Sequence, residues 1–101
     1  MWIFRTKPAE AGGDPLTFRL RAGGMKTLGR ATRADFIVDE PLISRMHCRF
    51  TAGATGALEV EDLESTNGTF VNGKRVTTSP LEPGDCVRVG RVEIEVSEAP
   101  N

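Results

Sequence analysis

Four short polar segments of this 101-residue sequence carry side chains that could bind an anion. They are Gly29–Arg30, Ser44–His47, Ser65–Thr69 and Val71–Gly73, and each comes at the end of an apolar run. Turn-forming residues in such places leave small polar or cationic side chains exposed on the loops of a β-scaffold. An arginine, several hydroxyl groups and two Asn-Gly pairs suit the binding of an anion better than they suit catalysis.

Catalysis and metal binding find little support in the same residues. Ser44 and His47 could act as nucleophile and base, but they share one short segment with no acidic residue to orient the histidine. No G-x-S-x-G, P-loop or H-E-x-x-H motif occurs. A zinc site would need His47, Cys48 and Cys86 with carboxylates, and residues 47 and 48 of one strand point to opposite faces. The sequence therefore predicts a protein that is not an enzyme and that holds no metal or cofactor.

The overall composition is that of a single soluble domain. Hydrophobic residues make up 39% of the chain and charged residues 27%. The net charge of −1, from 13 basic and 14 acidic residues, argues against non-specific nucleic-acid binding. Ten of the 13 basic residues are arginine, whose planar fork suits bidentate binding of phosphate.

The location inferred from the sequence is inside the cell. No apolar run approaches the roughly 20 residues of a membrane helix, and the opening segment MWIFRTKP is too short for a signal peptide. The two cysteines, Cys48 and Cys86, are expected to be free core thiols in a reducing compartment. The isolated domain is expected to be a monomer.

Alternation of apolar and polar residues dominates the chain, and no segment shows sustained helical periodicity. Turn signals recur every 8–12 residues. Expected strands are Trp2–Lys7, Leu16–Arg21, Met25–Leu28, Phe36–Val38, Met46–Thr51, Leu58–Leu63, Thr69–Val71, Lys74–Val76, Cys86–Val89 and Val92–Val96.

The turns between these strands predict an all-β sandwich. Asn72–Gly73 is a strong two-residue hairpin signal, and Gly23–Gly24 is expected to form another hairpin turn. Strands Met46–Thr51 and Leu58–Leu63 are expected to pair with each other. Leu16 is expected to lie on one face of its strand together with the apolar residues two and four positions later. Residues 1–101 form one domain in this reading, with a core over about 1–97 and a frayed tail, or the start of a linker, over 98–101.

Taken together, the polar segments resemble those of a forkhead-associated (FHA) domain. Gly29–Arg30, Ser44–His47, Ser65–Thr69 and Val71–Gly73 follow one another in that family's order, and Leu81–Asp85 with the Val-Gly pair at 89–90 matches its closing strands. The resemblance covers essentially the whole chain. It implies an FHA/SMAD-like β-sandwich of about eleven mostly antiparallel strands, whose loops at one end bind phosphothreonine peptides.

The resemblance also implies which residues contact the phosphopeptide. Arg30 would supply a cationic fork, Ser44 a hydroxyl donor, and Arg45 its backbone N–H and possible side-chain contact. Thr66 would donate a second hydroxyl, and Asn67 would hold the peptide backbone beside the phosphothreonine. Taken singly, each is an ordinary surface or turn residue. Occurring in this order and spacing, they point to phosphate binding.

A second set of residues is expected to support the loops rather than to touch the ligand. Gly29 permits a tight backbone path, and His47 ties the binding loops together by hydrogen bonds. Gly68 follows Asn67 in its turn, and Asn72 and Gly73 form a hairpin turn.

Selectivity for the peptide is expected from Leu42 and Ile43. The family uses this loop to read side chains a few residues beyond the phosphothreonine, and an arginine there would favour an acidic residue. With Leu42 in that place, the sequence predicts an apolar preference or weak selectivity.

The predicted function is recruitment of a parent protein to partners phosphorylated on threonine. The beginning of the chain and the loop at residues 11–16 are similar to nibrin-like proteins of DNA double-strand-break repair, which would place the chain in the nucleus. The alternatives are a cytoplasmic bacterial FHA adaptor in serine/threonine kinase signalling and a β-sandwich that binds unphosphorylated partners. Nucleic acid and membrane are not expected partners.

Overall fold

The computed structural model describes residues 1–7 and 15–100, and these residues form eleven β-strands. None of the described residues belongs to a helix that could cross a membrane. The strands are β1 (Trp2–Lys7), β2 (Thr17–Leu20), β3 (Met25–Gly29), β4 (Phe36–Ile37), β5 (Cys48–Ala52), β6 (Leu58–Asp62), β7 (Thr69–Val71), β8 (Lys74–Val76), β9 (Thr78–Leu81), β10 (Cys86–Val89) and β11 (Val92–Glu98).

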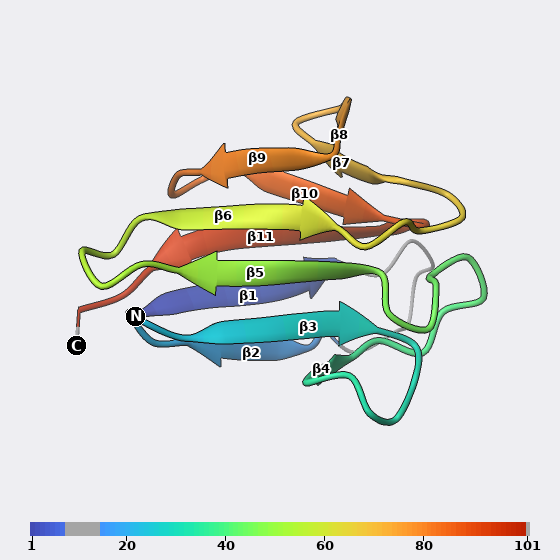
Figure 1. Ribbon diagram of the computed structural model, residues 1–101, viewed down its shortest axis with the longest axis horizontal. Helices are drawn as coiled ribbons and strands as arrows, with labels where there is room; N and C mark the ends of the chain where they lie inside the picture. Colours follow the sequence, from blue (N-terminus) through green and yellow to red (C-terminus); the bar gives the residue numbers. More distant parts are fainter. Residues whose placement is uncertain (8–14, 101) are drawn as a thin grey trace.

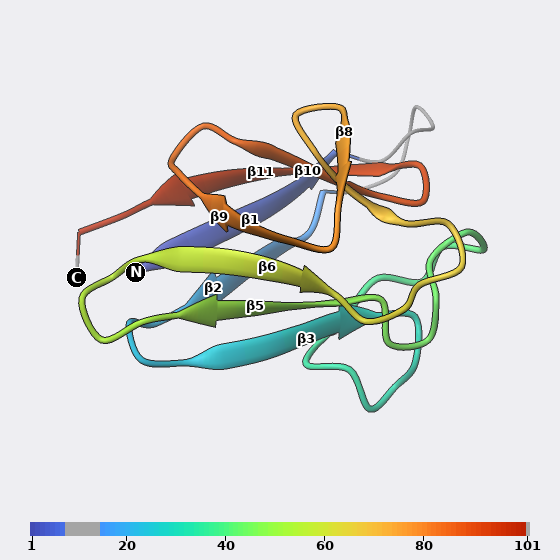
Figure 2. The same ribbon diagram turned by 45° about the horizontal axis from the view of Figure 1, so that its top comes forward.

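The strands form two sheets that pack face to face (Figures 1 and 2). The six-stranded sheet has the order β2-β1-β11-β10-β7-β8, and the five-stranded sheet has the order β4-β3-β5-β6-β9. Neighbouring strands are antiparallel except β3 and β4, which run parallel. The expected all-β sandwich, and the expected pairing of β5 with β6, are confirmed.

The core lies between the sheets because one face of each strand is apolar. Buried and exposed residues alternate along β11 from Val92 to Val96, and buried and partly buried residues alternate along β5. Phe4 of β1 packs on Phe50 of β5 with ring centroids 4.5 Å apart, and on Phe36 of β4 at 5.7 Å. Such aromatic pairs add about 0.5–1.5 kcal/mol each beyond the burial of their area, and these two join the sheets.

The connections with the polar segments gather at one end of the sandwich. The segments that join β3 to β4, β4 to β5, β6 to β7 and β10 to β11 all lie at the right of Figure 1. Strand direction decides this arrangement, because β3, β6 and β10 end where β5, β7 and β11 begin. The sandwich therefore brings segments far apart in sequence to a single edge.

Two predicted features of the first sheet connection are wrong. Gly23–Gly24 does not close a hairpin, because β2 and β3 belong to different sheets. The segment crosses between the sheets, and Gly23 donates its N–H to the Ala52 carbonyl over 2.9 Å. The predicted strand Leu16–Arg21 is one residue too long at each end, since β2 covers Thr17–Leu20, and Leu16 is 41% exposed.

The second half of the chain differs from the prediction at two places. Strand β9 is absent from the strands predicted from the sequence; it lies at a sheet edge, where Pro80 can be accommodated without a donor. Strand β11 continues to Glu98, and Ala99 donates its N–H to the Met1 carbonyl over 2.8 Å, so the predicted tail from residue 98 is too long. Residue 101 lies outside the described residues.

Both cysteines are free thiols, as predicted, but only one belongs to the core. Cys48 is fully buried, and this burial raises the pKa of its thiol. Cys86 is only partly buried, because it lies on the outer face of the six-stranded sheet opposite Glu95.

Candidate functional site

Gly29 and Arg30 occupy the point where β3 ends and the first polar loop begins. A side chain at Gly29 would not fit, because its Cβ atom would lie 2.0 Å from the Arg45 carbonyl oxygen. Arg30 is exposed, and it donates its backbone N–H to the Ser44 carbonyl over 3.0 Å and its Nε–H to the Ile43 carbonyl over 3.1 Å. Its guanidinium makes no other hydrogen bond within the described residues, so the two terminal amino groups remain for an anion.

The His47 ring connects two loops from inside the protein. The side chain is fully buried, and its Nδ1 accepts the Ser44 backbone N–H over 3.1 Å. The ring proton therefore lies on Nε2, which donates to the Gly68 carbonyl over 2.9 Å. Burial lowers the pKa of His47, although the Gly68 carbonyl and the Asp62 carboxylate partly offset that effect. The neutral ring thus holds segment 44–47 against loop 65–68.

Ser44 and Thr66 meet directly across these two loops. The Thr66 N–H donates to Ser44 Oγ over 3.0 Å, so the Ser44 hydroxyl keeps its own proton for another acceptor. Asn67 donates its Nδ2–H to the Leu42 carbonyl over 2.8 Å. Thr66 and Asn67 are both exposed, and the Asn67 side-chain oxygen is left for a ligand.

Arg45 offers two further donors beside Ser44. Its carbonyl accepts the Ala31 N–H over 3.1 Å, whereas its own N–H makes no hydrogen bond within the described residues. Its side chain is exposed. The structure thus brings together all five predicted contact residues, which come from three separate loops at one end of the sandwich.

Asp62 organises loop 65–68, and the sequence did not single it out. Its Oδ1 accepts hydrogen bonds from the hydroxyls of Ser65 and Thr69, at 2.5 and 2.8 Å, and its Oδ2 accepts the Ser65 N–H at 3.2 Å. The Ser65 hydroxyl in turn accepts the Gly68 N–H over 2.9 Å. Burial would raise the pKa of Asp62, but these hydrogen bonds outweigh it and the pKa lies below its ordinary value. The Asp-x-x-Ser-x-x-Gly spacing is the signal that could have found this network.

Gly68 occupies a position that requires glycine for two reasons. Its φ of +89° is in the left-handed region. A Cβ atom there would also lie 2.7 Å from Nε of Arg75 on β8, and 3.0 Å from its Cζ. The absence of a side chain therefore lets the Arg75 guanidinium pack against the loop that carries Thr66 and Asn67.

Only one of the two predicted selectivity residues is accessible. Leu42 is 41% exposed, whereas Ile43 is 1% exposed and belongs to the core. The prediction that the Ile43 side chain reads the peptide is therefore wrong, because that side chain is buried and only its carbonyl reaches the loops. Gly90, between β10 and β11, supports this pair: a Cβ there would meet both residues at 3.1–3.2 Å.

Asn72 and Gly73 lie in the β7–β8 hairpin, where their φ angles of +50° and +85° fit the expected two-residue turn. Asn72 donates to the Asp85 carboxylate over 3.0 Å and accepts the Cys86 N–H over 2.9 Å. These contacts fasten the hairpin to the start of β10. Asn72 therefore supports that hairpin, and within the part of the chain that the structure describes no hydrogen bond joins it to the loops around Arg30.

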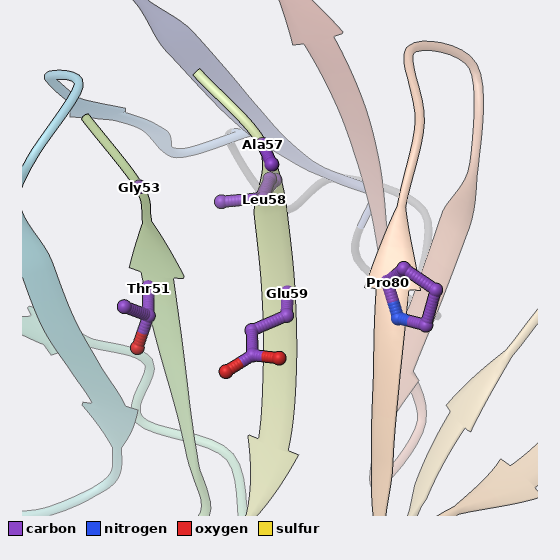
Figure 3. A pocket seen from close by; sticks show the side chains of 6 residues that line it. All are labelled: Thr51, Gly53, Ala57, Leu58, Glu59 and Pro80. Atoms are coloured by element: carbon purple, nitrogen blue, oxygen red, sulfur yellow. The ribbon is translucent and has the colours of Figure 1, made fainter. Parts of the chain in front are cut away.

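One shallow hollow, of about 270 Å³, lies away from this set of donors. Figure 3 shows the residues that line it, among them Thr51, Glu59 and Pro80. It lies near the β5–β6 turn, at the opposite end of the sandwich from the polar loops (Figure 1). Among residues 1–7 and 15–100, no three His, Cys, Asp or Glu side chains gather as a metal ion would require.

Comparison with known proteins identifies relatives of this chain. A family profile described as FHA domain matches residues 26–90. The ABC transporter ATP-binding/permease protein Rv1747 of Mycobacterium tuberculosis is 39% identical over 79 residues, which are 78% of this chain and 9% of the relative. The oxoglutarate dehydrogenase inhibitor of Corynebacterium diphtheriae is 35% identical over 74 residues, 73% of this chain and 51% of the relative. The chain thus spans at most about half the length of these two relatives.

Solved structures show the same fold over nearly the whole chain. One, from a study of phosphothreonine-dependent FHA domain interactions, is 31% identical with a TM-score of 0.85, and covers 99% of this chain and 98% of that one. The FhaA FHA domain complexed with the intracellular domain of Rv3910 is 31% identical with a TM-score of 0.82, covering 95% and 99%. None of these four descriptions refers to DNA repair, so the expected nibrin-like origin and nuclear location have no support from them.

Proposed function

The chain belongs to the FHA domain family, and from this premise we propose that it binds phosphothreonine peptides as an adaptor in bacterial serine/threonine kinase signalling. The relatives from M. tuberculosis and C. diphtheriae favour this alternative over a role in DNA repair. One relative was solved in complex with an intracellular domain, which fits action in the cytoplasm.

The observation that carries the proposal is the 3.0 Å hydrogen bond from the Thr66 N–H to Ser44 Oγ. It joins two loops that each present a hydroxyl donor; the Arg45 N–H belongs to the Ser44 loop, and the Arg30 guanidinium to a third loop that is hydrogen-bonded to it. A phosphothreonine carries a charge of about −1.5 to −2 and three acceptor oxygens, so these donors match it in number and sign.

The expected affinity follows from the number of these contacts. A hydrogen bond to a charged group contributes about 1.5–3 kcal/mol. Three or four of them, less the cost of immobilising a flexible peptide, correspond to a dissociation constant around 1 μM. Such an affinity suits reversible recruitment. Binding should weaken below about pH 6, where the phosphate loses its second negative charge.

Fluorescence anisotropy with three matched peptide pools tests the proposal. The pools carry phosphothreonine, phosphoserine or unmodified threonine at a fixed position among random neighbours. We expect micromolar binding of the phosphothreonine pool only, weakened about 10- to 100-fold by Arg30→Ala through the loss of one charged contact. Arg30 is exposed, so this variant should remain folded.

The matched control is Arg19→Ala. Arg19 is an exposed arginine of β2, opposite Ile3 at the end of the sandwich away from the polar loops. Equal binding of all pools, or equal effects of the two arginine substitutions, would refute the proposed site.

A further inference from the structure

Arg75 of β8 is a second cation beside the proposed peptide site. It lies opposite Phe70 of β7, on the outer face of the six-stranded sheet. From there its side chain reaches the loop end, because an ideal Cβ on Gly68 would lie 2.7 Å from Nε, 3.0 Å from Cζ and 3.3 Å from Cδ. The guanidinium is thus packed on the backbone of loop 65–68.

The position of Gly68 places Arg75 within reach of a bound peptide. Gly68 directly follows Asn67, which is hydrogen-bonded to the Leu42 carbonyl, and comes two residues after Thr66, which is hydrogen-bonded to Ser44. Two residues span at most about 7 Å, and an extended peptide advances about 3.3 Å per residue. A peptide anchored at Ser44 and crossing Asn67 therefore comes beside Arg75 within about two to four residues of its phosphothreonine.

Arg75 has its donors available, whereas the neighbouring arginine does not. Its side chain is exposed, and it makes no hydrogen bond or ion pair within the described residues. Arg88, the next cation in the same cross-strand row, donates to the Gly90 carbonyl over 3.1 Å and lies 4.1 Å from the centre of the Phe70 ring. The Arg75 guanidinium is therefore packed on Gly68 with its donors available, and its planar group suits bidentate binding of a carboxylate.

We propose that Arg75 selects an acidic side chain in the phosphothreonine peptide. This inference rests on the proposed function, because it concerns the same peptide. Asn67 is hydrogen-bonded to the Leu42 carbonyl, and Arg75 packs on Gly68, the next residue along the chain. The acidic preference read by Arg75 is thus separate from any apolar preference read by Leu42.

A positional scan of phosphothreonine peptides, with Asp, Lys or Ala at each flanking position, tests this inference by fluorescence anisotropy. We expect the unaltered domain to bind its preferred acidic peptide about three- to tenfold more tightly than the alanine peptide. Arg75→Gln should remove that ratio without changing affinity for the alanine peptide, Arg75→Lys should keep part of it, and Arg75→Glu should favour lysine at the same position.

Lys74→Gln is the matched control. Lys74 is the exposed residue before Arg75 and lies beside the hairpin turn, and the substitution removes one positive charge there. It should leave the ratio unchanged. The inference about Arg75 is wrong if the Arg75 substitutions leave the acidic preference intact, if no such preference exists, or if Lys74→Gln has the same effect. Absence of any phosphothreonine binding by the unaltered domain would overturn the proposed function as well.

Discussion

Replacing His47 by alanine tests how the binding loops are held together. The substitution removes hydrogen bonds of 3.1 and 2.9 Å and leaves the Ser44 N–H and the Gly68 carbonyl without partners. Each unsatisfied buried group costs about 1–3 kcal/mol, so the two cost roughly 2–6 kcal/mol before the cavity is counted. That is a large part of the roughly 5–15 kcal/mol by which a domain is stable. His47→Asn should lose less, because an asparagine oxygen can replace Nδ1 as acceptor for Ser44.

The same residue predicts how stability depends on pH. Burial lowers the pKa of His47 below its ordinary value of 6.5, so the unfolded chain binds the proton more readily than the native one. The stabilisation by the neutral ring is therefore fully present above pH 6.5 and is lost as the pH falls through the lower native pKa. His47 is the only histidine of the chain, and carboxylates titrate mostly near pH 4. The part of the decline between pH 7.5 and 5.5 that comes from His47 should therefore disappear when His47 is replaced.

Urea denaturation, followed by the fluorescence of the single buried tryptophan, Trp2, measures both effects. The unaltered domain, His47→Ala and His47→Asn are compared at pH 7.5, 6.5 and 5.5. A loss of less than about 1 kcal/mol for His47→Ala at pH 7.5 would refute the role of the two hydrogen bonds. Stability that rises as the pH falls, or an equal slope in all three proteins, would refute the account of the buried neutral ring.

Three further substitutions test the supports of the loops and of the neighbouring hairpin. Gly29→Ala should lower the free energy of unfolding by about 3 kcal/mol or more in thermal denaturation, because the new methyl group would overlap the Arg45 carbonyl; a loss below 1 kcal/mol would contradict this. Asp62→Asn should weaken phosphothreonine-peptide binding about tenfold by calorimetry, since the amide nitrogen would face the Ser65 N–H; unchanged affinity would argue against the network. Asn72→Ala should cost about 2 kcal/mol in stability and leave peptide affinity unchanged, so a joint loss of both would show that the hairpin shapes the site.

Local patterns in the sequence predicted most of the strands and one turn. Where apolar and polar residues alternate, as in Cys86–Val89, the alternation itself predicts which face of the strand is buried. Asn72 and Gly73 predicted their hairpin because they are the residues that most readily adopt positive φ. The order of the polar segments identified the family, and with it the five residues proposed to contact the peptide.

Pairing between distant strands was decided only in the folded protein. The alternation around Leu20 and Met25 would be the same if β2 and β3 formed a hairpin or lay on facing sheets. The structure places them on facing sheets. Ile43 illustrates a related limit: it follows the exposed Leu42 in a loop, yet its side chain fills the core because Gly90 of another loop leaves room beside it.

Local sequence patterns also do not predict the contacts between loops at the proposed site. Arg75 is an ordinary charged residue in the sequence, and its spacing from Ser44 or Arg30 indicates no partner. The structure joins Thr66 to Ser44 by a hydrogen bond between loops and brings Arg75 to the backbone of Gly68. Local sequence determines backbone preference and the buried face of each strand because both depend on near neighbours. Hydrogen bonds and packing between loops depend on distances that exist only after the two sheets have come together.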